Sequence, residues 1–196
     1  MTASDALEKL QQGHADFLAR RPIPAPDAER IRYLAEHGQH PHAVVVTCSD
    51  SRVVPEILFH CQPGDIFTVR TAGNVVSDIE MGSIEYAVDH LGVRLVLVLG
   101  HTHCGAVAGA CEGHHGHGGH CGCLDALLSN VAPAVEAART AAQDDASIVR
   151  RAEDLHILAM ARRIAQNPAL QGIAGVRIVA AKYDIASGQI DWDVQE

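Results

Sequence analysis

The sequence predicts an α/β domain with a mainly parallel β-sheet flanked by helices. Four short apolar runs rich in Val and Ile lack the alternation of a half-exposed antiparallel strand, so they are typical of strands buried on both faces. Helical patterns separate these runs along the chain, and strands that alternate with helices favour parallel pairing. The predicted strands are 43–50, 65–72, 94–101 and 176–185.

The chain opens with a predicted helix over 4–19, for which Ser4 is the expected N-cap. The Pro-rich stretch 20–26 follows, so residues 1–26 are predicted to form a helical arm. Such an arm packs either on its own domain or on a neighbouring subunit, and the sequence leaves both open. The other predicted elements are helices over 83–91, 124–142 and 147–166, and a turn at 187–188 that leads into a short last strand.

One segment, 111–123, has an unusual composition of five Gly, four His and three Cys. Its lack of apolar side chains predicts a loop. Imidazoles titrate near neutral pH, so its histidines could relay protons, or bind metal together with the cysteines, and an inert surface insertion is the alternative. With no repeat and no second domain, 1–196 is predicted to be a single domain. The histidines are His114, His115, His117 and His120.

The bulk composition excludes several classes of function. Lys and Arg number 15 against 24 Asp and Glu, a net charge of −9, which predicts no nucleic-acid partner and no binding to an anionic membrane. No apolar run approaches the ~20 residues that span a bilayer, and the polar start lacks a signal-peptide core. We therefore expect a cytoplasmic protein, whose six cysteines serve as thiols or metal ligands rather than disulfides.

Two motifs follow two of the predicted strands, CSDSR at 48–52 and GHTHCGA at 100–106. Carboxyl ends of parallel strands share one edge of a sheet, where ligand sites form. Cys48, His101 and Cys104 can therefore converge on one cation. Thiolate and imidazole ligands favour zinc, and three protein ligands leave a fourth position for water, as in catalytic zinc sites. Alone, Cys48 would be read as a buried apolar residue and His101 as a core histidine.

A possible catalytic pair lies inside the first motif. Asp50 follows Cys48 by two residues and Arg52 follows Asp50 by two, and in an extended segment this spacing places side chains on one face. Arg52 can then bind Asp50 through a bidentate ion pair that keeps the carboxylate ionised beside the zinc-bound water. An ordinary ion pair at a strand end is the alternative.

Four blocks in order then resemble the β-class carbonic anhydrases, and the similarity runs from about Leu7 to the last strand. This resemblance implies zinc at Cys48, His101 and Cys104, with Asp50 and Arg52 as the catalytic dyad. It implies reversible hydration of carbon dioxide to bicarbonate and a proton by attack of a zinc-bound hydroxide. The blocks are CSDSRVVPE (48–56), PGDIFTVRTAGN (63–74), SIEYAV (83–88) and GHTHCGA (100–106).

The resemblance also assigns a substrate site. Gln39 matches a residue that hydrogen-bonds the substrate oxygen, and Phe67 and Tyr86 match an apolar wall, which suits a small uncharged substrate. Gly105 follows the last ligand and is expected to allow close backbone approach to the site. The family implies at least a dimer with active sites at the subunit interface. In a closed state of some members the equivalent of Asp50 binds zinc as a fourth ligand.

Two other functions compete with this prediction. The same zinc ligands would serve a hydrolase of carbonyl sulfide or carbon disulfide, against which the CSDSR form weighs. A non-catalytic zinc-binding protein is the second alternative, and the Asp50–Arg52 pair weighs against it, because metal storage needs no such pair.

Overall fold

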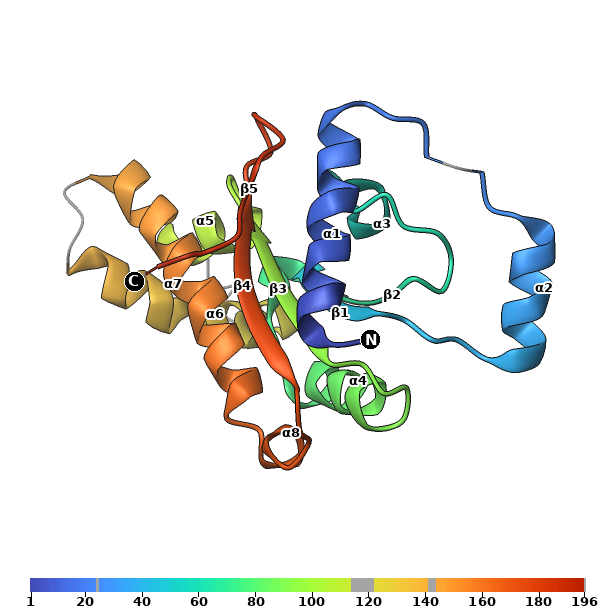
Figure 1. Cartoon of the computed structure of the whole chain (residues 1–196). Coiled ribbons are helices and arrows are strands. Elements are labelled where there is room, and N and C mark those ends of the chain that lie inside the picture. The colour runs from blue at the N-terminus through green and yellow to red at the C-terminus, as the bar shows by residue number, and fades with distance from the viewer. Residues whose placement is uncertain (24, 114–121, 141–143, 196) are drawn as a thin grey trace.

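The computed structural model describes residues 1–23, 25–113, 122–140 and 144–195. Its centre is a five-stranded sheet in the order β2-β1-β3-β4-β5 (Figure 1). The first four strands pair in parallel, and β5 pairs antiparallel to β4. This confirms the mainly parallel sheet, the four predicted strands and the short last one. The strands are β1 Ala43–Cys48, β2 Ile66–Thr71, β3 Leu95–His101, β4 Arg177–Tyr183 and β5 Ile190–Asp191.

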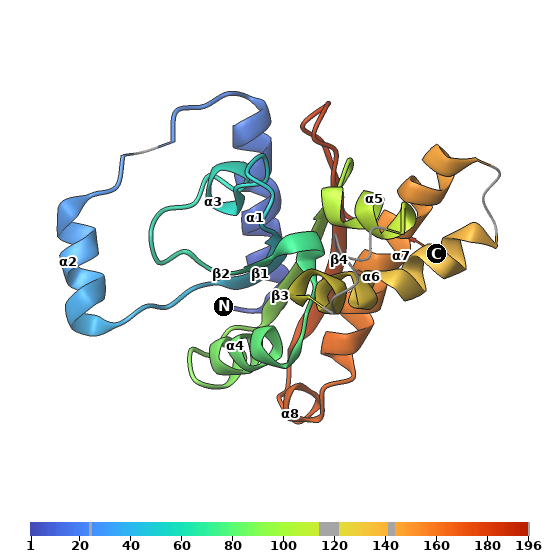
Figure 2. The same ribbon diagram turned by 180° about the vertical axis from the view of Figure 1, so that it is seen from behind.

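Helices lie on both sides of this sheet (Figure 2). One side packs against α1 and α3, and the other packs against α4 and α7, with α5 and α6 beyond them at one end of the strands. The helices are α1 Ala3–Leu18, α2 Ala28–His37, α3 Pro55–Leu58, α4 Asp78–Asp89, α5 Gly105–Cys111, α6 Cys123–Arg139, α7 Asp145–Ala165 and α8 Pro168–Gln171, with a 3-10 turn η1 at Ala72–Asn74.

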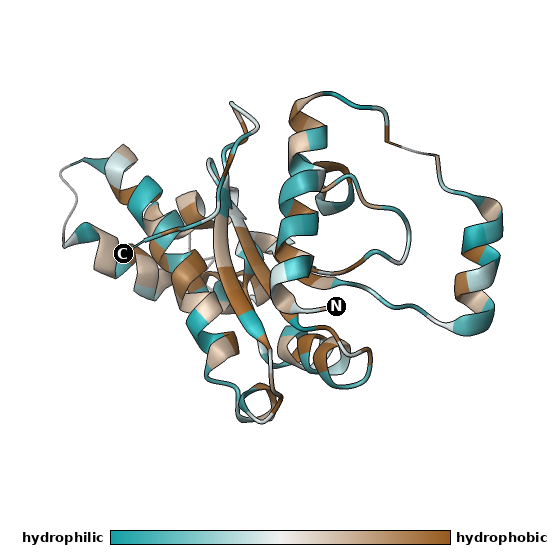
Figure 3. Ribbon diagram, in the orientation of Figure 1, coloured by the Kyte–Doolittle hydropathy of each residue, from teal (hydrophilic) through white to brown (hydrophobic). Residues whose placement is uncertain are grey.

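Apolar residues make up most of the central strands, whose ribbons are largely brown in Figure 3. Successive side chains of a strand point to opposite faces. In β3, Leu97 therefore joins the core shared with α1, while Val96 and Val98 join the core shared with α4 and α7. All seven residues of β3 are buried. This two-sided burial explains why the sequence shows continuous apolar runs in place of alternation.

The predicted helix 4–19 is α1, and it packs on the sheet of its own chain. Leu10 is completely buried in the core that includes β1 and β3. A Cβ on Gly13 would lie 1.9 Å from the carbonyl oxygen of Phe59, so only glycine allows the two backbones to approach this closely. The N-cap is Thr2 and not Ser4, because Thr2 and Asp5 form a reciprocal capping box.

The helix that stands apart from the sheet is α2, which the sequence analysis did not predict (Figure 1). None of its residues is buried, and Ile31 and Tyr33 expose 48% and 57% of their surface. An ion pair of 2.7 Å between Arg30 and Asp65 links α2 to the turn before β2. Within the predicted arm 1–26, α1 therefore packs on the sheet of its own chain. The element that projects from the sheet is α2, which begins after this arm.

The boundaries of the predicted loop 111–123 differ in the structure. Its first residue, Cys111, ends α5, and its last, Cys123, begins α6. The four histidines of the loop lie outside the described residues, as does the end of the predicted helix 124–142. Among the described helices, none is both long and apolar enough to cross a membrane.

The docking of α1 gives a test of the core. Leu10→Ala should lower the free energy of unfolding by about 2–5 kcal/mol, because it removes a fully buried side chain and leaves a cavity. Leu18→Ala on the same helix, where the side chain is 38% exposed, should cost less than about 1 kcal/mol. Urea denaturation measures both, and equal losses would mean that Leu10 does not anchor α1.

Candidate metal centre

Three potential metal ligands converge at the carboxyl edge of the sheet. Cys48 ends β1, His101 ends the neighbouring strand β3, and Cys104 immediately precedes α5. Their ligand atoms all lie within 4.8 Å of one another, and all three residues are buried. The structure therefore brings together the three residues that the two motifs predict.

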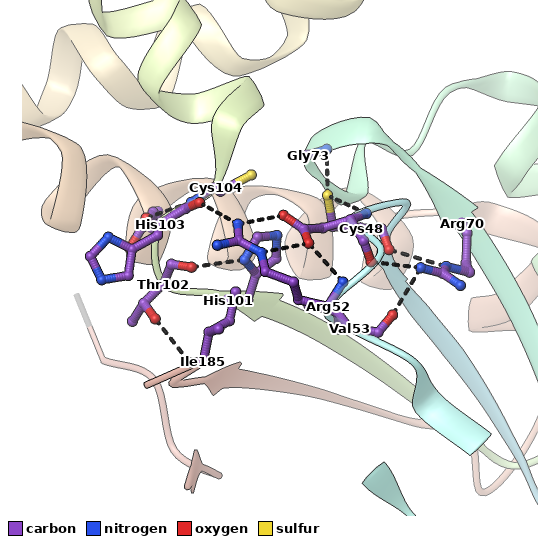
Figure 4. A network of polar contacts seen from close by, with 12 residues as sticks. Cys48, Arg52, Val53, Arg70, Gly73, His101, Thr102, His103, Cys104 and Ile185 are labelled. Carbon is purple, nitrogen blue, oxygen red and sulfur yellow. Dashed lines mark hydrogen bonds and ion pairs between the residues drawn. The ribbon is translucent and has the colours of Figure 1, made fainter. Parts of the chain in front are cut away.

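The turn after β3 brings its two ligands to the same side. His103 adopts a left-handed conformation with φ of 58°, which reverses the chain between His101 and Cys104. The backbone N–H of Thr102 donates to the carbonyl of Tyr183 in β4 at 2.9 Å. The Thr102 hydroxyl accepts a hydrogen bond from the N–H of Ile185 at 3.1 Å (Figure 4). The end of β4 thus holds the turn in place.

The imidazole of His101 is oriented for metal binding. Its Nδ1 lies 2.9 Å from the carbonyl oxygen of Thr102, and because a carbonyl only accepts, Nδ1 carries the proton. The other ring nitrogen, Nε2, is buried and has no hydrogen-bond partner among the described residues. A buried nitrogen lone pair without a donor is costly, and a metal ion at this position would satisfy it.

The two thiols also fit a metal. A hydrogen bond from the Cys104 thiol lowers the pKa of Cys48 to about 4, and backbone N–H donors from Asp50 and Gly73 assist against the opposing effect of burial. The pKa of Cys104 is raised, because its proton is shared with the Cys48 thiolate. One negative charge is therefore already stable here, and a divalent cation would stabilise the second thiolate. The five cysteines that the structure describes are free, as the sequence predicted.

The Asp50–Arg52 pair has the expected bidentate geometry. Arg52 Nε donates to Asp50 Oδ1 at 2.9 Å, and Nη2 donates to Oδ2 at 2.7 Å. These hydrogen bonds hold the pKa of the Asp50 carboxyl well below its usual range. The segment is a tight turn and not the extended chain that the sequence analysis assumed, since the Arg52 N–H also donates to Oδ1 of Asp50. A further bond from Arg52 to the carbonyl of His103, 3.2 Å long, joins the two motifs (Figure 4).

Arg70 is a site residue that the sequence analysis did not single out. It lies on β2 beside Thr47 of β1, and its guanidinium donates to three carbonyls of the neighbouring turn (Figure 4). The bonds reach Cys48 at 3.1 Å, Asp50 at 2.9 Å and Val53 at 2.8 Å. A planar group with five donors suits this task. The signal that could have identified Arg70 is its position in β2, the strand that pairs with the strand of Cys48.

The predicted substrate residues lie away from this metal centre in the same chain. Gln39 is exposed and precedes β1, whereas Cys48 ends that strand, whose six residues span about 20 Å. Phe67 pairs in register with Val44, four residues or about 13 Å along the strand from Cys48. Tyr86 accompanies Phe67, with ring centroids 6.2 Å apart, and is 46% exposed. The chain therefore does not gather these residues around its own metal ligands.

The role expected for Gly105, close approach of the backbone to the site, stays a prediction, because the packing of the described residues places no demand for glycine there. Gly105 begins α5 and is exposed, and a Cβ placed on it would meet no heavy atom within 4 Å in the part of the chain that the structure describes. Close backbone approach occurs instead at Gly100, where a Cβ would lie 2.3 Å from the side chain of Ile157. Glycine at this position lets β3 pack tightly against α7.

Comparisons with known proteins agree with this geometry. The carbonic anhydrase family model matches residues 43–190. "Carbonic anhydrase 2" of Mycobacterium tuberculosis is 37% identical over 190 residues, which cover 94% of this chain and 89% of that protein. The chain belongs to the β-class carbonic anhydrase family.

Solved structures give the same fold. The β-carbonic anhydrase CafA of Aspergillus fumigatus has a TM-score of 0.74 at 31% identity, covering 98% of this chain and 91% of that one. A tetrameric β-carbonic anhydrase of Sordaria macrospora has a TM-score of 0.70 at 28% identity, covering 96% of this chain and 94% of that one.

The metal centre can be tested by removing one ligand. Purified Cys104→Ala protein should lose its stoichiometric divalent metal, because two remaining ligands bind far more weakly than three. Cys61→Ala is the matched control, since this buried cysteine is not among the clustered ligands. Elemental analysis of both variants gives the result, and full metal content in the Cys104 variant would contradict the assignment.

Proposed function

We propose that this protein catalyses the reversible hydration of carbon dioxide to bicarbonate and a proton, with zinc bound by Cys48, His101 and Cys104. The observation that carries the proposal is the buried Cys-His-Cys cluster beside an intact Asp50–Arg52 pair in a β-class carbonic anhydrase. We further propose the cytoplasm as its location, which rests on the sequence alone.

The donor set supports zinc. Thiolate sulfur and imidazole nitrogen are the ligands that zinc prefers, while magnesium and calcium prefer oxygen. Zinc with three protein ligands acidifies a water molecule in its remaining position, which makes that water a nucleophile near neutral pH.

The residues around the cluster would orient the reacting groups. Asp50 is ionised, and its Oδ2 keeps a lone pair beyond the bond from Arg52, so it can accept a hydrogen bond from an incoming water and fix the orientation of that water. Arg52 and Arg70 keep the carboxylate from rotating, because they bind its side chain and its backbone carbonyl. The intact ion pair supports an open resting site. Asp50 could become a fourth metal ligand only after releasing Arg52.

A second copy of the chain would complete the substrate site. Gln39, Phe67 and Tyr86 lie toward the opposite end of the strands from the metal ligands of their own chain. Their proposed roles with carbon dioxide therefore need the neighbouring subunit to present them. The likeness to a tetrameric relative supports such self-association. The proposed assembly is a dimer or a larger oligomer.

The catalytic pair is tested by Asp50→Asn. The amide retains the shape of the carboxylate but cannot hold its charge, so carbon dioxide hydration should fall by roughly 100-fold or more while zinc content stays stoichiometric. Asp89→Asn, whose carboxylate is 68% exposed, is the control and should retain full activity. Stopped-flow hydration assays with elemental analysis measure both properties. An Asp50→Asn protein that hydrates carbon dioxide at the parental rate would refute the catalytic role of Asp50, whereas a zinc-loaded parent that does not hydrate carbon dioxide would refute the proposed function.

Shared sites are tested by mixing inactive chains. Cys104→Ala chains lack the metal, and Gln39→Ala chains lack the proposed substrate donor. Co-expressed, they should form mixed dimers with one complete site each, which restores about a quarter of the parental activity if pairing is random. If the co-expressed chains show only the sum of the activities that the two variants have separately, each chain uses its own Gln39. Sedimentation velocity checks that mixed assemblies form.

A further inference from the structure

Two buried titratable side chains of α7, Glu153 and His156, are not used by the proposed mechanism. They are 3% and 1% exposed, and they lie three residues apart, which places them on one face of the helix. That face packs against the core that contains Cys48 and Cys104. Neither side chain is among the clustered metal ligands.

Glu153 binds the backbone of a metal ligand. Its Oε1 accepts a hydrogen bond of 3.1 Å from the N–H of Cys104. Cys104 is the N-cap of α5, and the peptide group that precedes it is held from both sides, by Glu153 at its N–H and by Arg52 at the carbonyl of His103. A charged acceptor forms a stronger hydrogen bond than a neutral one. The position of the Cys104 sulfur therefore depends on Glu153.

Lys182 of β4 forms an ion pair with Glu153. Its ammonium lies 2.9 Å from Glu153 Oε2, while its directed hydrogen bonds go to Asp154 and to the carbonyl of Arg150. Burial alone would lower the pKa of Lys182, but the carboxylates of Asp154 and Glu153 outweigh it and raise that pKa. A buried ion pair contributes little to stability compared with an apolar pair of the same size. Stability alone therefore does not explain why a buried ion pair lies at this site.

His156 acts on the other thiol through the backbone of a single residue, Gly73, whose C=O and N–H lie on the two sides of its Cα. Burial lowers the pKa of His156, so the ring is neutral, and its Nε2 donates to the carbonyl of Gly73 at 2.8 Å. The N–H of Gly73 in turn donates to the sulfur of Cys48 at 3.2 Å (Figure 4). Gly73 has a positive φ of 66°, a conformation that glycine adopts without the steric cost of a side chain.

We propose that α7 positions both thiolate ligands of the metal, with Glu153 acting on Cys104 and His156 acting on Cys48 through Gly73. Both are positioning residues, since neither touches the metal site directly. This inference rests on the proposed zinc enzyme and adds the residues that set its metal affinity. Outer contacts of this kind typically change metal affinity by 10–100-fold.

The test measures cobalt binding and not activity. The main variant is Glu153→Met/Lys182→Met, which replaces the ion pair by an apolar pair of similar length and leaves the N–H of Cys104 without its acceptor. It should still unfold cooperatively in urea, with stability lowered by no more than the cost of one unsatisfied N–H, about 1–3 kcal/mol, but bind cobalt at least about 10-fold more weakly, with a changed sulfur-to-cobalt absorption band. The affinity comes from competition with a chelator. Parental affinity and an unchanged band would overturn the role of Glu153.

Asp154→Asn is the matched control. This variant loses an equivalent ion pair with Lys182, yet the Cys104 N–H keeps its bond to Glu153. Its cobalt affinity should stay within about 3-fold of the parent, and a loss as large as that of the Glu153 variant would overturn the proposal. If the double variant does not fold, Glu153→Gln replaces it. Gln keeps a weaker acceptor for the N–H of Cys104. The Glu153→Gln protein must therefore still bind cobalt more weakly than the Asp154→Asn control.

His156 is tested in the same assay. His156→Leu removes the donor to Gly73 and should weaken cobalt binding about 10-fold, while His156→Gln keeps an N–H donor and should lose less. Equal affinities of both variants and the parent would overturn the role of His156. A parent that binds no cobalt at all would instead overturn the proposed function, which separates the two failures.

Discussion

The parallel pairing of β1 with β3 is the constraint on which the rest of the structure depends. It places the end of β1, with Cys48, beside the end of β3, with His101, although the two residues are far apart in sequence. Both strands are buried on both faces, so a shift by one residue would exchange the side chains that fill the two cores and disturb the packing of both. The hydrophobic core thus determines which polar side chains meet at the sheet edge.

A sheet edge with two thiols, an imidazole, a carboxylate and two guanidinium groups is electrostatically costly to assemble. The cost is offset locally, since each charge has a partner or a set of carbonyl acceptors. Arg52 neutralises Asp50, Arg70 binds carbonyls of the same turn, and backbone N–H groups point at the Cys48 sulfur. Fixed dipoles of this kind are in place before any substrate arrives, and they need no reorganisation during a reaction.

Patterns of buried strands and of strand ends predicted the sheet and the metal cluster, because both depend on local apolar runs and on a general rule for parallel sheets. What the sequence did not reveal depends on long-range contacts. Glu153 lies 49 residues from the Cys104 N–H that it binds, and no local pattern marks a helical glutamate as buried. The helix α2 was missed although Ile31 and Leu34 have helical spacing, and this helix buries none of its residues in the fold. The N-cap was misplaced by two residues, as helix ends usually are.

Because the strands are long, the metal ligands and the proposed substrate residues lie at two separate places in the chain. Metal ligands need the carboxyl edge, where turns between strands and helices present side chains. The aromatic pair of Phe67 and Tyr86 lies on the amino-terminal half of β2 and on α4, where an apolar surface is left half-exposed. One chain cannot bend its sheet to bring these places together, since the register of five strands would have to break. A second chain laid across the first can do so without disturbing either core, which is the physical reason that the proposed substrate site calls for the proposed self-association.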